Sequence, residues 1–217
     1  MKKHSANELK IHFLMCTMGG FVGAYALLLR GGNFGSASTG NLLECMIMIA
    51  ECKPLDVIIR LGGGFLFALP FMVSKWMEKR TSINRHRLCL YGEILVMFLL
   101  ALLPIDMNPV LALYPLFFIT GFQWSVFSGT SQYNCSTIFI SNNTRQCATA
   151  LSEYLLENDS GQADKSWFYG RSILCYLGGG LVSAYLAHHF GPVASVAGIL
   201  MPLLVLLFTK NFTSNIK

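Results

Sequence analysis

The sequence predicts an all-α membrane protein with about six transmembrane helices, two broken half-helix segments and an internal inverted repeat, in a single membrane domain over residues 1–217. The first observation is composition, because 53% of the residues are hydrophobic and only 12% are charged. The usual charged share is about 25%. The second is a series of long apolar segments, and the third is the confinement of basic residues to short clusters between them. A soluble surface needs more charge, so we expect a fold embedded in lipid.

Six segments are apolar over a length that meets or approaches a membrane span. About 20 residues are needed to cross roughly 30 Å of hydrocarbon. The segments are 11–30, 57–77, 88–105, 109–130, 168–188 and 192–209. The first follows Lys2, Lys3 and Lys10 as the apolar part of a signal peptide would. It is too long for that role and is followed by an equally apolar chain, so we interpret it as the first span.

Two further segments, 31–50 and 131–153, are too polar at their beginnings to form full spans. Each starts with a run of small and polar residues and ends in a short, more apolar stretch. Non-helical backbone at membrane depth is tolerated only where protein buries it or where it lines a watery cavity, because lipid cannot satisfy free N–H and C=O groups. We therefore expect these two segments to carry the function.

The two halves of the chain resemble each other. A shift of 102 residues aligns Gly19 with Gly121, Asn41 with Asn143, Cys45 with Cys147 and Glu51 with Glu153. The glycine triplet 62–64 recurs at 178–180 with a shift of 116, so we place the extra residues in a polar loop at 154–167. We interpret this pattern as a duplication with repeats at about 11–105 and 109–209. The glycine triplets let neighbouring helices approach closely in lipid.

The distribution of lysine and arginine predicts the topology, since short loops rich in these residues stay in the cytoplasm. The basic loop 75–87, the N-terminus and the C-terminus then all lie inside. The N-terminus and the basic loop share a side only if segment 31–50 enters the membrane and returns. Each repeat then has three spans, and an odd number places tandem copies in opposite orientations, as in many secondary transporters.

The alternative topology has both broken segments crossing the membrane fully. Each copy would then have four spans and the two copies would be parallel. The basic loop 75–87 would lie outside, against the usual bias of basic loops toward the cytoplasm.

The beginnings of the two half-helices are the candidate solute site. Ser38 or Thr39 can cap a helix that begins near Gly40, and Ser141 or Asn142 can do so in the second copy. Such helix starts direct free N–H groups and a positive dipole end toward a solute. The expected substrate-binding residues of the two starts are Ser38, Thr39, Gly40, Asn41, Ser141, Asn142 and Asn143. Beside the first start, Arg30 either adds a positive charge or anchors the chain at the lipid headgroups.

Three further polar residues lie in apolar surroundings and join the candidate site. Glu93 is either a functional intramembrane carboxylate or an interfacial group satisfied by water or Arg87. Glu44 lies in the first half-helix, and Gln146 takes its place in the second copy, so a proton or cation role is one alternative for it. Gln123 is costly in lipid and is expected to face the interior, where it can hydrogen-bond between helices.

No catalytic or metal site is predicted. The seven cysteines are scattered singly without a C-x-x-C pair, so we expect neither metal nor cofactor. The chain has no G-x-S-x-G, H-E-x-x-H or G-x-x-x-x-G-K-[ST] motif, and we expect no enzyme. The net charge of +5 comes from the loop clusters rather than from one basic face, so no nucleic-acid partner is expected.

A resemblance to a known family rests on two groups of motifs. The run from Arg30 to Asn41 ends in Thr39-Gly40-Asn41 and follows Gly19-Gly20-Phe21-Val22-Gly23-Ala24-Tyr25, while Gly121-Phe122-Gln123 precedes Ser141-Asn142-Asn143. In these motifs, and over nearly its whole length, the chain resembles the YoaK-like family of uncharacterised bacterial membrane proteins. It departs from the family pattern at Asn142, where the family has glycine. The resemblance implies a multi-spanning membrane protein and assigns no activity.

We therefore expect a small inner-membrane transporter or channel-like protein for a small polar or anionic solute, with both termini in the cytoplasm. Its expected partners are the lipid bilayer and the solute, and a homodimer is one way for so small a bundle to enclose a path. The alternative is a non-transporting scaffold or regulatory subunit, in which the glycine-rich segments only allow close helix packing.

Overall fold

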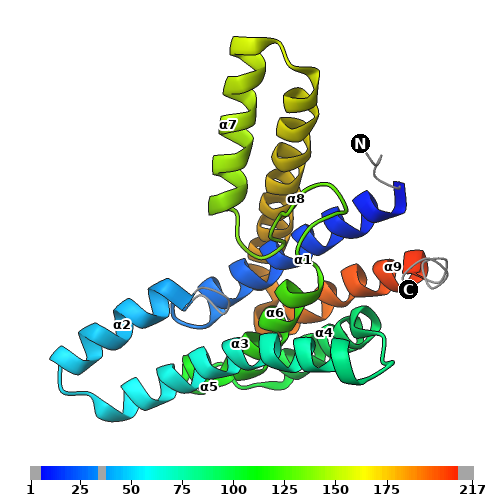
Figure 1. Cartoon of the computed structure of the whole chain (residues 1–217). Coiled ribbons are helices and arrows are strands. Elements are labelled where there is room, and N and C mark those ends of the chain that lie inside the picture. The colour runs from blue at the N-terminus through cyan, green and yellow to red at the C-terminus, as the bar shows by residue number, and fades with distance from the viewer. Residues whose placement is uncertain (1–5, 34–37, 210–217) are drawn as a thin grey trace.

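The computed structural model describes residues 6–33 and 38–209, and these residues form helices, loops and a single β-bridge between Gly129 and Asn134 (Figure 1). The elements are α1 (Ala6–Leu29), α2 (Ser38–Ala50), α3 (Pro54–Arg80), α4 (Arg85–Leu102), α5 (Pro109–Ala112), α6 (Tyr114–Val126), α7 (Ser141–Glu157), α8 (Ser160–Phe190), the 3-10 helix η1 (Gly191–Ile199) and α9 (Leu200–Thr209). The all-α prediction is confirmed. Residues 34–37 of the first broken segment lie outside the described part of the chain.

Three helical stretches are long and apolar enough to cross a membrane, namely α1, α3 and the run from Ser160 to Thr209. The last stretch has 50 residues. The chain turns within it at Gly191, whose φ of 60° suits glycine, so the stretch consists of α8 followed by η1 and α9. Helix α4 has 18 residues, which corresponds to about 27 Å of helix.

The predicted span 109–130 is wrong as a single helix. It consists of α5, with 4 residues, and α6, with 13 residues, and a 13-residue helix is only about 20 Å long. The chain turns at Leu113 before Tyr114 and Pro115, and proline suits the first turn of a new helix because it lacks the N–H that would be unpaired there. At the other end, α6 stops before Gly129, whose φ is 141°.

The predicted polar loop 154–167 is also wrong, because this segment is helical except at Asn158 and Asp159. Asn158 ends α7 in the left-handed conformation, with φ 54° and ψ 32°, which asparagine tolerates better than most residues. Asp159 begins α8 by accepting a hydrogen bond from the N–H of Gly161 at 2.8 Å. The extra residues of the second half therefore lengthen its helices.

The helices of the bundle pack in two parallel pairs, one of α1 with α8 and one of α6 with α3. In the first pair His12 contacts Ser172, and further along Gly20 lies against Tyr176 and Gly180. In the second pair the Tyr114 hydroxyl donates to the Ile59 carbonyl at 2.7 Å, and further along Gly121 lies against Phe67. The first helix of each half of the chain thus packs on a helix of the other half.

The bundle has two ends that are made of different segments. Glu8, Asn84 and Thr209 line one cavity, so the beginnings of α1 and α4 and the end of α9 meet there; we call this the cavity end. Arg30 and Tyr25 bind to carbonyl groups of Pro104 and Pro192, so the end of α1, the end of α4 and the beginning of η1 meet at the opposite, Arg30 end. In the chain direction, α1 and α8 run from the cavity end to the Arg30 end, and α3 and α6 run from the Arg30 end to the cavity end.

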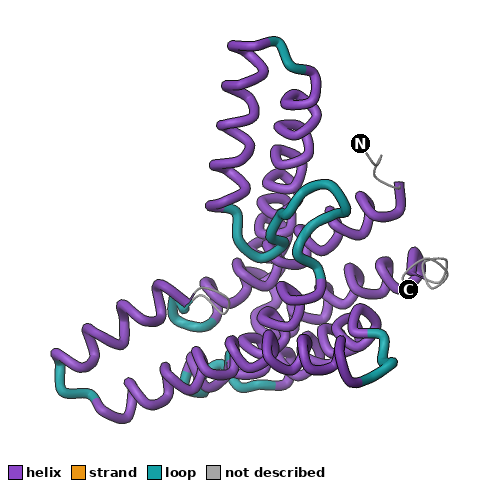
Figure 2. Tube along the Cα trace, in the orientation of Figure 1, coloured by secondary structure: helices purple, strands orange, loops and turns teal. Residues whose placement is uncertain are grey.

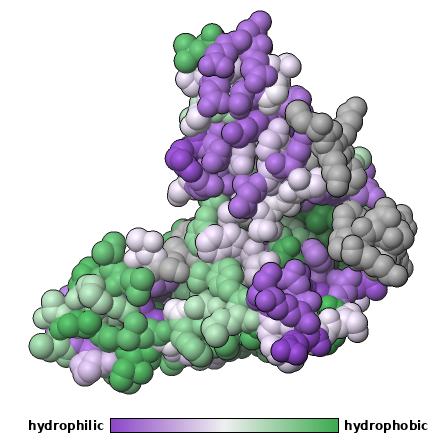
Figure 3. All heavy atoms as spheres, viewed as in Figure 1, coloured by the Kyte–Doolittle hydropathy of each residue, from purple (hydrophilic) through white to green (hydrophobic). Residues whose placement is uncertain are grey.

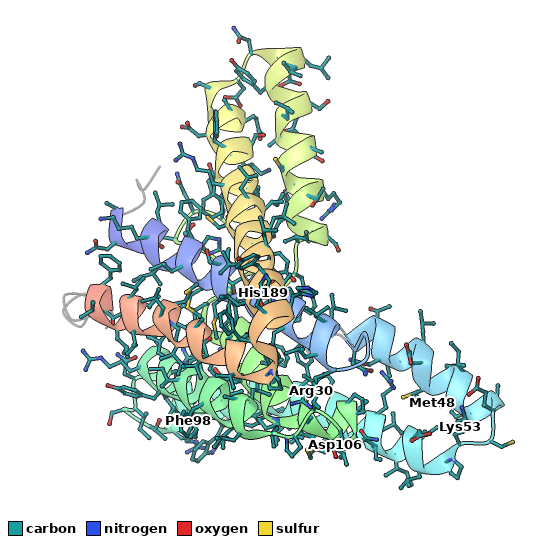
Figure 4. The ribbon with its side chains drawn as sticks, turned by 180° about the vertical axis from the view of Figure 1, so that it is seen from behind. Arg30, Met48, Lys53, Phe98, Asp106 and His189 are labelled. Atoms are coloured by element: carbon teal, nitrogen blue, oxygen red, sulfur yellow. The ribbon has the colours of Figure 1, made fainter. Side chains whose placement is uncertain are left out.

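Two helical hairpins extend from the bundle in different directions (Figure 1). In the first, α2 packs on the beginning of α3 and leads away from the end of α1; Lys53 lies at its tip, far from Arg30 (Figure 4). In the second, α7 packs on the beginning of α8. The first hairpin is hydrophobic on its outside and the second is largely hydrophilic (Figure 3). Exposed large apolar residues of the first hairpin are Leu42, Leu43, Met46, Ile47, Leu55, Ile58 and Phe65.

Candidate solute site

The first predicted helix start lies in the hydrophobic hairpin. Helix α2 begins at Ser38. The next two residues, Thr39 and Gly40, are exposed, and Asn41 is buried. The Asn41 Oδ1 accepts a hydrogen bond from Nη1 of Arg60 at 2.8 Å, and Nη2 of Arg60 forms an ion pair with Oε2 of Glu44 at 3.2 Å. Two of the expected residues, Asn41 and Glu44, therefore come together around one guanidinium. Asn41 and Arg60 line a cavity of about 260 Å³ between α2 and α3.

Arg60 itself was not singled out from the sequence. Its side chain is 6% exposed, and it lies in α3 within the predicted span 57–77. An ionisable residue inside an apolar segment marks a functional candidate by default, so its position in this segment was a signal that could have found it.

The second predicted helix start is organised differently. Helix α7 begins at Ser141 after Ile140, without a hydrogen bond from a capping side chain, so neither Ser141 nor Asn142 caps it as predicted. Asn142 is exposed, and its Oδ1 accepts from Nη2 of Arg145 at 3.0 Å. Asn143 is buried and donates from Nδ2 to the carbonyl of Ser136 at 2.7 Å. Asn41 and Asn143 align in the sequence, but each binds a group of its own half of the chain.

The loop between α6 and α7 is not helical (Figure 2), and its second part is largely buried. Cys135, Thr137 and Ile138 are each 0% exposed. Gln123 faces this interior, as expected, and its Nε2 donates to the Met15 carbonyl at 3.1 Å and to the Thr137 Oγ1 at 3.1 Å. Protein groups thus satisfy the polar atoms that lipid could not.

Arg30 is 0% exposed, so it is not an anchor at the lipid headgroups. Its Nη1 donates to the carbonyl of Pro104 at 2.7 Å and its Nη2 to the carbonyl of Leu103 at 3.1 Å. These two carbonyls follow the last residue of α4, and a cation at the C-terminal end of a helix is favourable for the helix dipole. The Tyr25 hydroxyl adds hydrogen bonds to the carbonyls of Leu100 and Pro192, both at 3.2 Å.

Glu93 lies in the interior of the bundle and not at an interface. It is 1% exposed, and its Oε1 accepts a weak hydrogen bond from the Cys89 Sγ at 3.8 Å. Its Oε2 has no hydrogen-bond partner within residues 6–33 and 38–209. Arg87 is not among the groups that pair with this carboxyl, so the structure does not place Glu93 at an interface beside Arg87.

A cavity of about 250 Å³ lies at the cavity end of the bundle. Its lining residues are Glu8, Ile11, His12, Asn84, His86, Arg87, Val126, Phe127, Gly129 and Thr209. His12 is 2% exposed, stacks on Phe168 with 5.0 Å between ring centroids, and lies 3.2 Å from the Ser172 Oγ through Nε2. His12 was not predicted as a site residue, although its imidazole lies inside the predicted span 11–30.

The groups that could bind a metal are dispersed. Across the described ranges, no three or more His, Cys, Asp or Glu side chains gather in a way that could hold a metal ion.

Residues 11–209 match a family described as a protein of unknown function, DUF1275. The resemblance to the YoaK-like family is consistent with this match. No curated protein and no solved structure matches the chain.

Proposed function

Because the chain belongs to the DUF1275 family, whose function is unknown, we propose from its geometry that it is a multi-pass membrane transporter for a small polar or anionic solute. The observation that carries the proposal is the difference between the two ends of the bundle. A cavity with charged and imidazole groups lies at one end, and buried hydrogen bonds of Tyr25 and Arg30 join the helices at the other.

The packing supports two inverted repeats. Helix α1 packs on α8 and α9, and α6, which aligns with α1, packs on α3 and α4. The α1/α8 pair and the α6/α3 pair run in opposite directions between the two ends, because α1 begins and α6 ends at the cavity, which Ile11 and Val126 line. Two copies of one unit in opposite orientations are the plan of many secondary transporters, whose solute sites lie between the repeats.

The charge distribution supports an orientation with the cavity end in the cytoplasm. Asn84 and Arg87, next to the basic loop 75–87, line the cavity together with Glu8 and Thr209. Lys10 lies over the ring of Phe208 at the same end. The beginning of α1, the basic loop and the end of α9 therefore meet on one side, which is what the positive-inside rule requires of cytoplasmic segments.

In this proposal the structure represents an inward-open state. The Arg30 end is the closed side, because Arg30 and Tyr25 fill it and bind α4 and η1. Alternating access would open this end and close the cavity.

Solute flux tests the proposal. Purified protein in liposomes is challenged with potassium salts of chloride, acetate and phosphate, and with the neutral solutes glycerol and urea, in a stopped-flow light-scattering assay. Wild type should raise the permeability of at least one solute above that of protein-free liposomes. Asn41→Leu and His12→Phe should lower it, and His189→Phe, at an exposed position, should not.

The second candidate is a non-transporting scaffold. It is favoured by the close approach of helices at glycine, since a Cβ at Gly20 would overlap the Tyr176 carbonyl and a Cβ at Gly179 would overlap the Thr17 carbonyl. A scaffold predicts permeability equal to that of empty liposomes for every solute. That result in folded, reconstituted protein would overturn the transporter proposal.

A further inference from the structure

We propose that the cavity at the α1, α4 and α9 junction binds a small oxyanion, a carboxylate or a phosphate, through the guanidinium of Arg87. The role of this site in transport rests on the proposed function, but the binding itself does not. Nothing in the sequence motifs pointed to this site, because Arg87 was considered there only as a partner for Glu93.

Among the described residues, the charges around the cavity leave Arg87 without a counter-ion. Arg85, two residues earlier, pairs with Glu78 at 3.4 Å and donates to the Ser74 hydroxyl at 3.1 Å. The guanidinium of Arg87 has no hydrogen-bond or ion-pair partner within the described ranges 6–33 and 38–209. The first turn of α4 contains no acidic residue that could neutralise it.

The single carboxylate of the cavity wall is already engaged. Glu8 accepts hydrogen bonds from the backbone N–H and from the hydroxyl of Ser131, the second at 3.0 Å. The carboxylate thus holds the loop after α6 in place, while Arg87 faces the remaining cavity with two imidazoles, His12 and His86. A wall with one unpaired guanidinium and two imidazoles favours an anion over a cation.

The volume of the cavity and the geometry of the Arg87 donors limit which anions can bind. A volume of about 250 Å³ corresponds to about eight water molecules at roughly 30 Å³ each, which suits an ion of a few non-hydrogen atoms with some water. The planar guanidinium presents parallel N–H groups that match two oxygens of a carboxylate or phosphate. The matching ligand is therefore a small oxyanion, either free in the cytoplasm or as the headgroup of an anionic lipid.

Binding in detergent distinguishes these sources without requiring transport. Isothermal titration of the full chain uses sodium acetate, sodium phosphate and, below its micelle concentration, dihexanoylphosphatidylglycerol, with sodium chloride holding the ionic strength constant. Wild type should bind acetate or phosphate saturably. Arg87→Gln should raise the Kd at least tenfold and Arg87→Lys should raise it less, while Arg80→Gln, at an exposed position nearby, should leave it unchanged.

Each outcome decides the proposal. Saturable binding of the lipid alone, lost in Arg87→Gln, supports the oxyanion site and assigns it to a headgroup. The proposal is overturned if none of the three probes binds saturably to wild type. It is also overturned if Arg87→Gln elutes as a folded monodisperse species and binds the probes with the same affinity as wild type. If the protein binds an oxyanion but shows no flux in liposomes, the transporter proposal is rejected and the binding site stands. If wild type shows flux that Arg87→Gln leaves unchanged, and neither protein binds the probes, only the binding site is rejected.

Discussion

The Nη1 of Arg30 donates a hydrogen bond to the carbonyl oxygen of Pro104 at 2.7 Å, although the two residues are 74 positions apart in the chain. The guanidinium is fully buried, so this bond ties the end of α1 to the segment that follows α4. A buried cation is costly unless it is well paired, and here carbonyl groups at a helix end supply the partners. The contact explains how an arginine can close one end of an apolar bundle.

Replacing this cation should loosen the Arg30 end. Arg30→Met removes two charge-assisted hydrogen bonds, to Pro104 and Leu103, and leaves both carbonyls unpaired, so we expect a loss of about 3 kcal/mol in stability. Thermal unfolding in detergent, followed by size-exclusion chromatography, measures it. Arg145→Met, at an exposed arginine on α7, is the control, and an equal melting temperature for both variants would contradict the assigned role of Arg30.

The glycine triplet of α8 offers a matched pair of substitutions. A Cβ at Gly179 would overlap the backbone carbonyl of Thr17 on α1, whereas a Cβ at Gly178 meets nothing within 4 Å. Gly179→Ala should destabilise the protein by about 1–3 kcal/mol, the usual cost of forcing extra atoms into a packed interior. Gly178→Ala should be neutral or slightly stabilising, because alanine favours a helix by about 1 kcal/mol over glycine. Similar melting temperatures for the two variants would refute the close α1/α8 contact.

Substitutions at two adjacent asparagines can test what holds the loop before α7 in place. Asn143 is 1% exposed and holds the Ser136 carbonyl at 2.7 Å, while Asn142 is exposed. Asn143→Leu leaves a buried carbonyl without its donor and should cost about 1–3 kcal/mol, and Asn142→Leu should cost much less. Limited proteolysis should show earlier cleavage within residues 127–140 in Asn143→Leu only. Cleavage at the same rate in both variants would show that Asn143 does not hold this loop.

The ion pair of the first hairpin should show strong coupling. Glu44→Gln leaves the buried guanidinium of Arg60, 6% exposed, without its counter-charge. Glu44 itself is 54% exposed, so the buried partner is the guanidinium alone. The double variant Glu44→Gln with Arg60→Met removes the buried charge that Glu44→Gln leaves without a partner. We expect the double variant to be more stable than Glu44→Gln alone, with a coupling of about 1–2 kcal/mol. Additive losses in the double-mutant cycle would argue that the pair contributes nothing.

Orientation in the membrane can be measured with single cysteines in a cysteine-free background. Asn84→Cys, in the cavity wall, should react with a membrane-impermeant maleimide only from the cytoplasmic side, whereas Asp106→Cys, at the exposed turn after α4, should react only from outside. Spheroplasts and inverted vesicles provide the two sides. Labelling of both positions from the same side would contradict the proposed crossing of α4.

The sequence predicts the positions of the long helices better than it predicts the short helices or the contacts of the candidate site. The long helices were predictable, because runs such as 57–77 and 168–188 are apolar throughout apart from single polar residues. The short helices α5 and α6 were not, since the predicted span 109–130 is apolar on average while Pro115 and Gly129 break its backbone. The helical nature of 154–167 was hidden by its polarity, because α7 and the beginning of α8 lie in the hydrophilic hairpin (Figure 3).

The sequence by itself determined the helical class and the apolar segments, because these depend on local composition and on spacing along one chain. Only the tertiary structure decided what the polar residues contact. It joined Arg60 to Asn41, Gln123 to Met15 and Arg30 to Pro104, and it gathered His12, His86 and Arg87 around one cavity. The reason is physical, since a buried polar group must find its partner in space, and the packing of α1 on α8 and of α6 on α3 sets which residues meet.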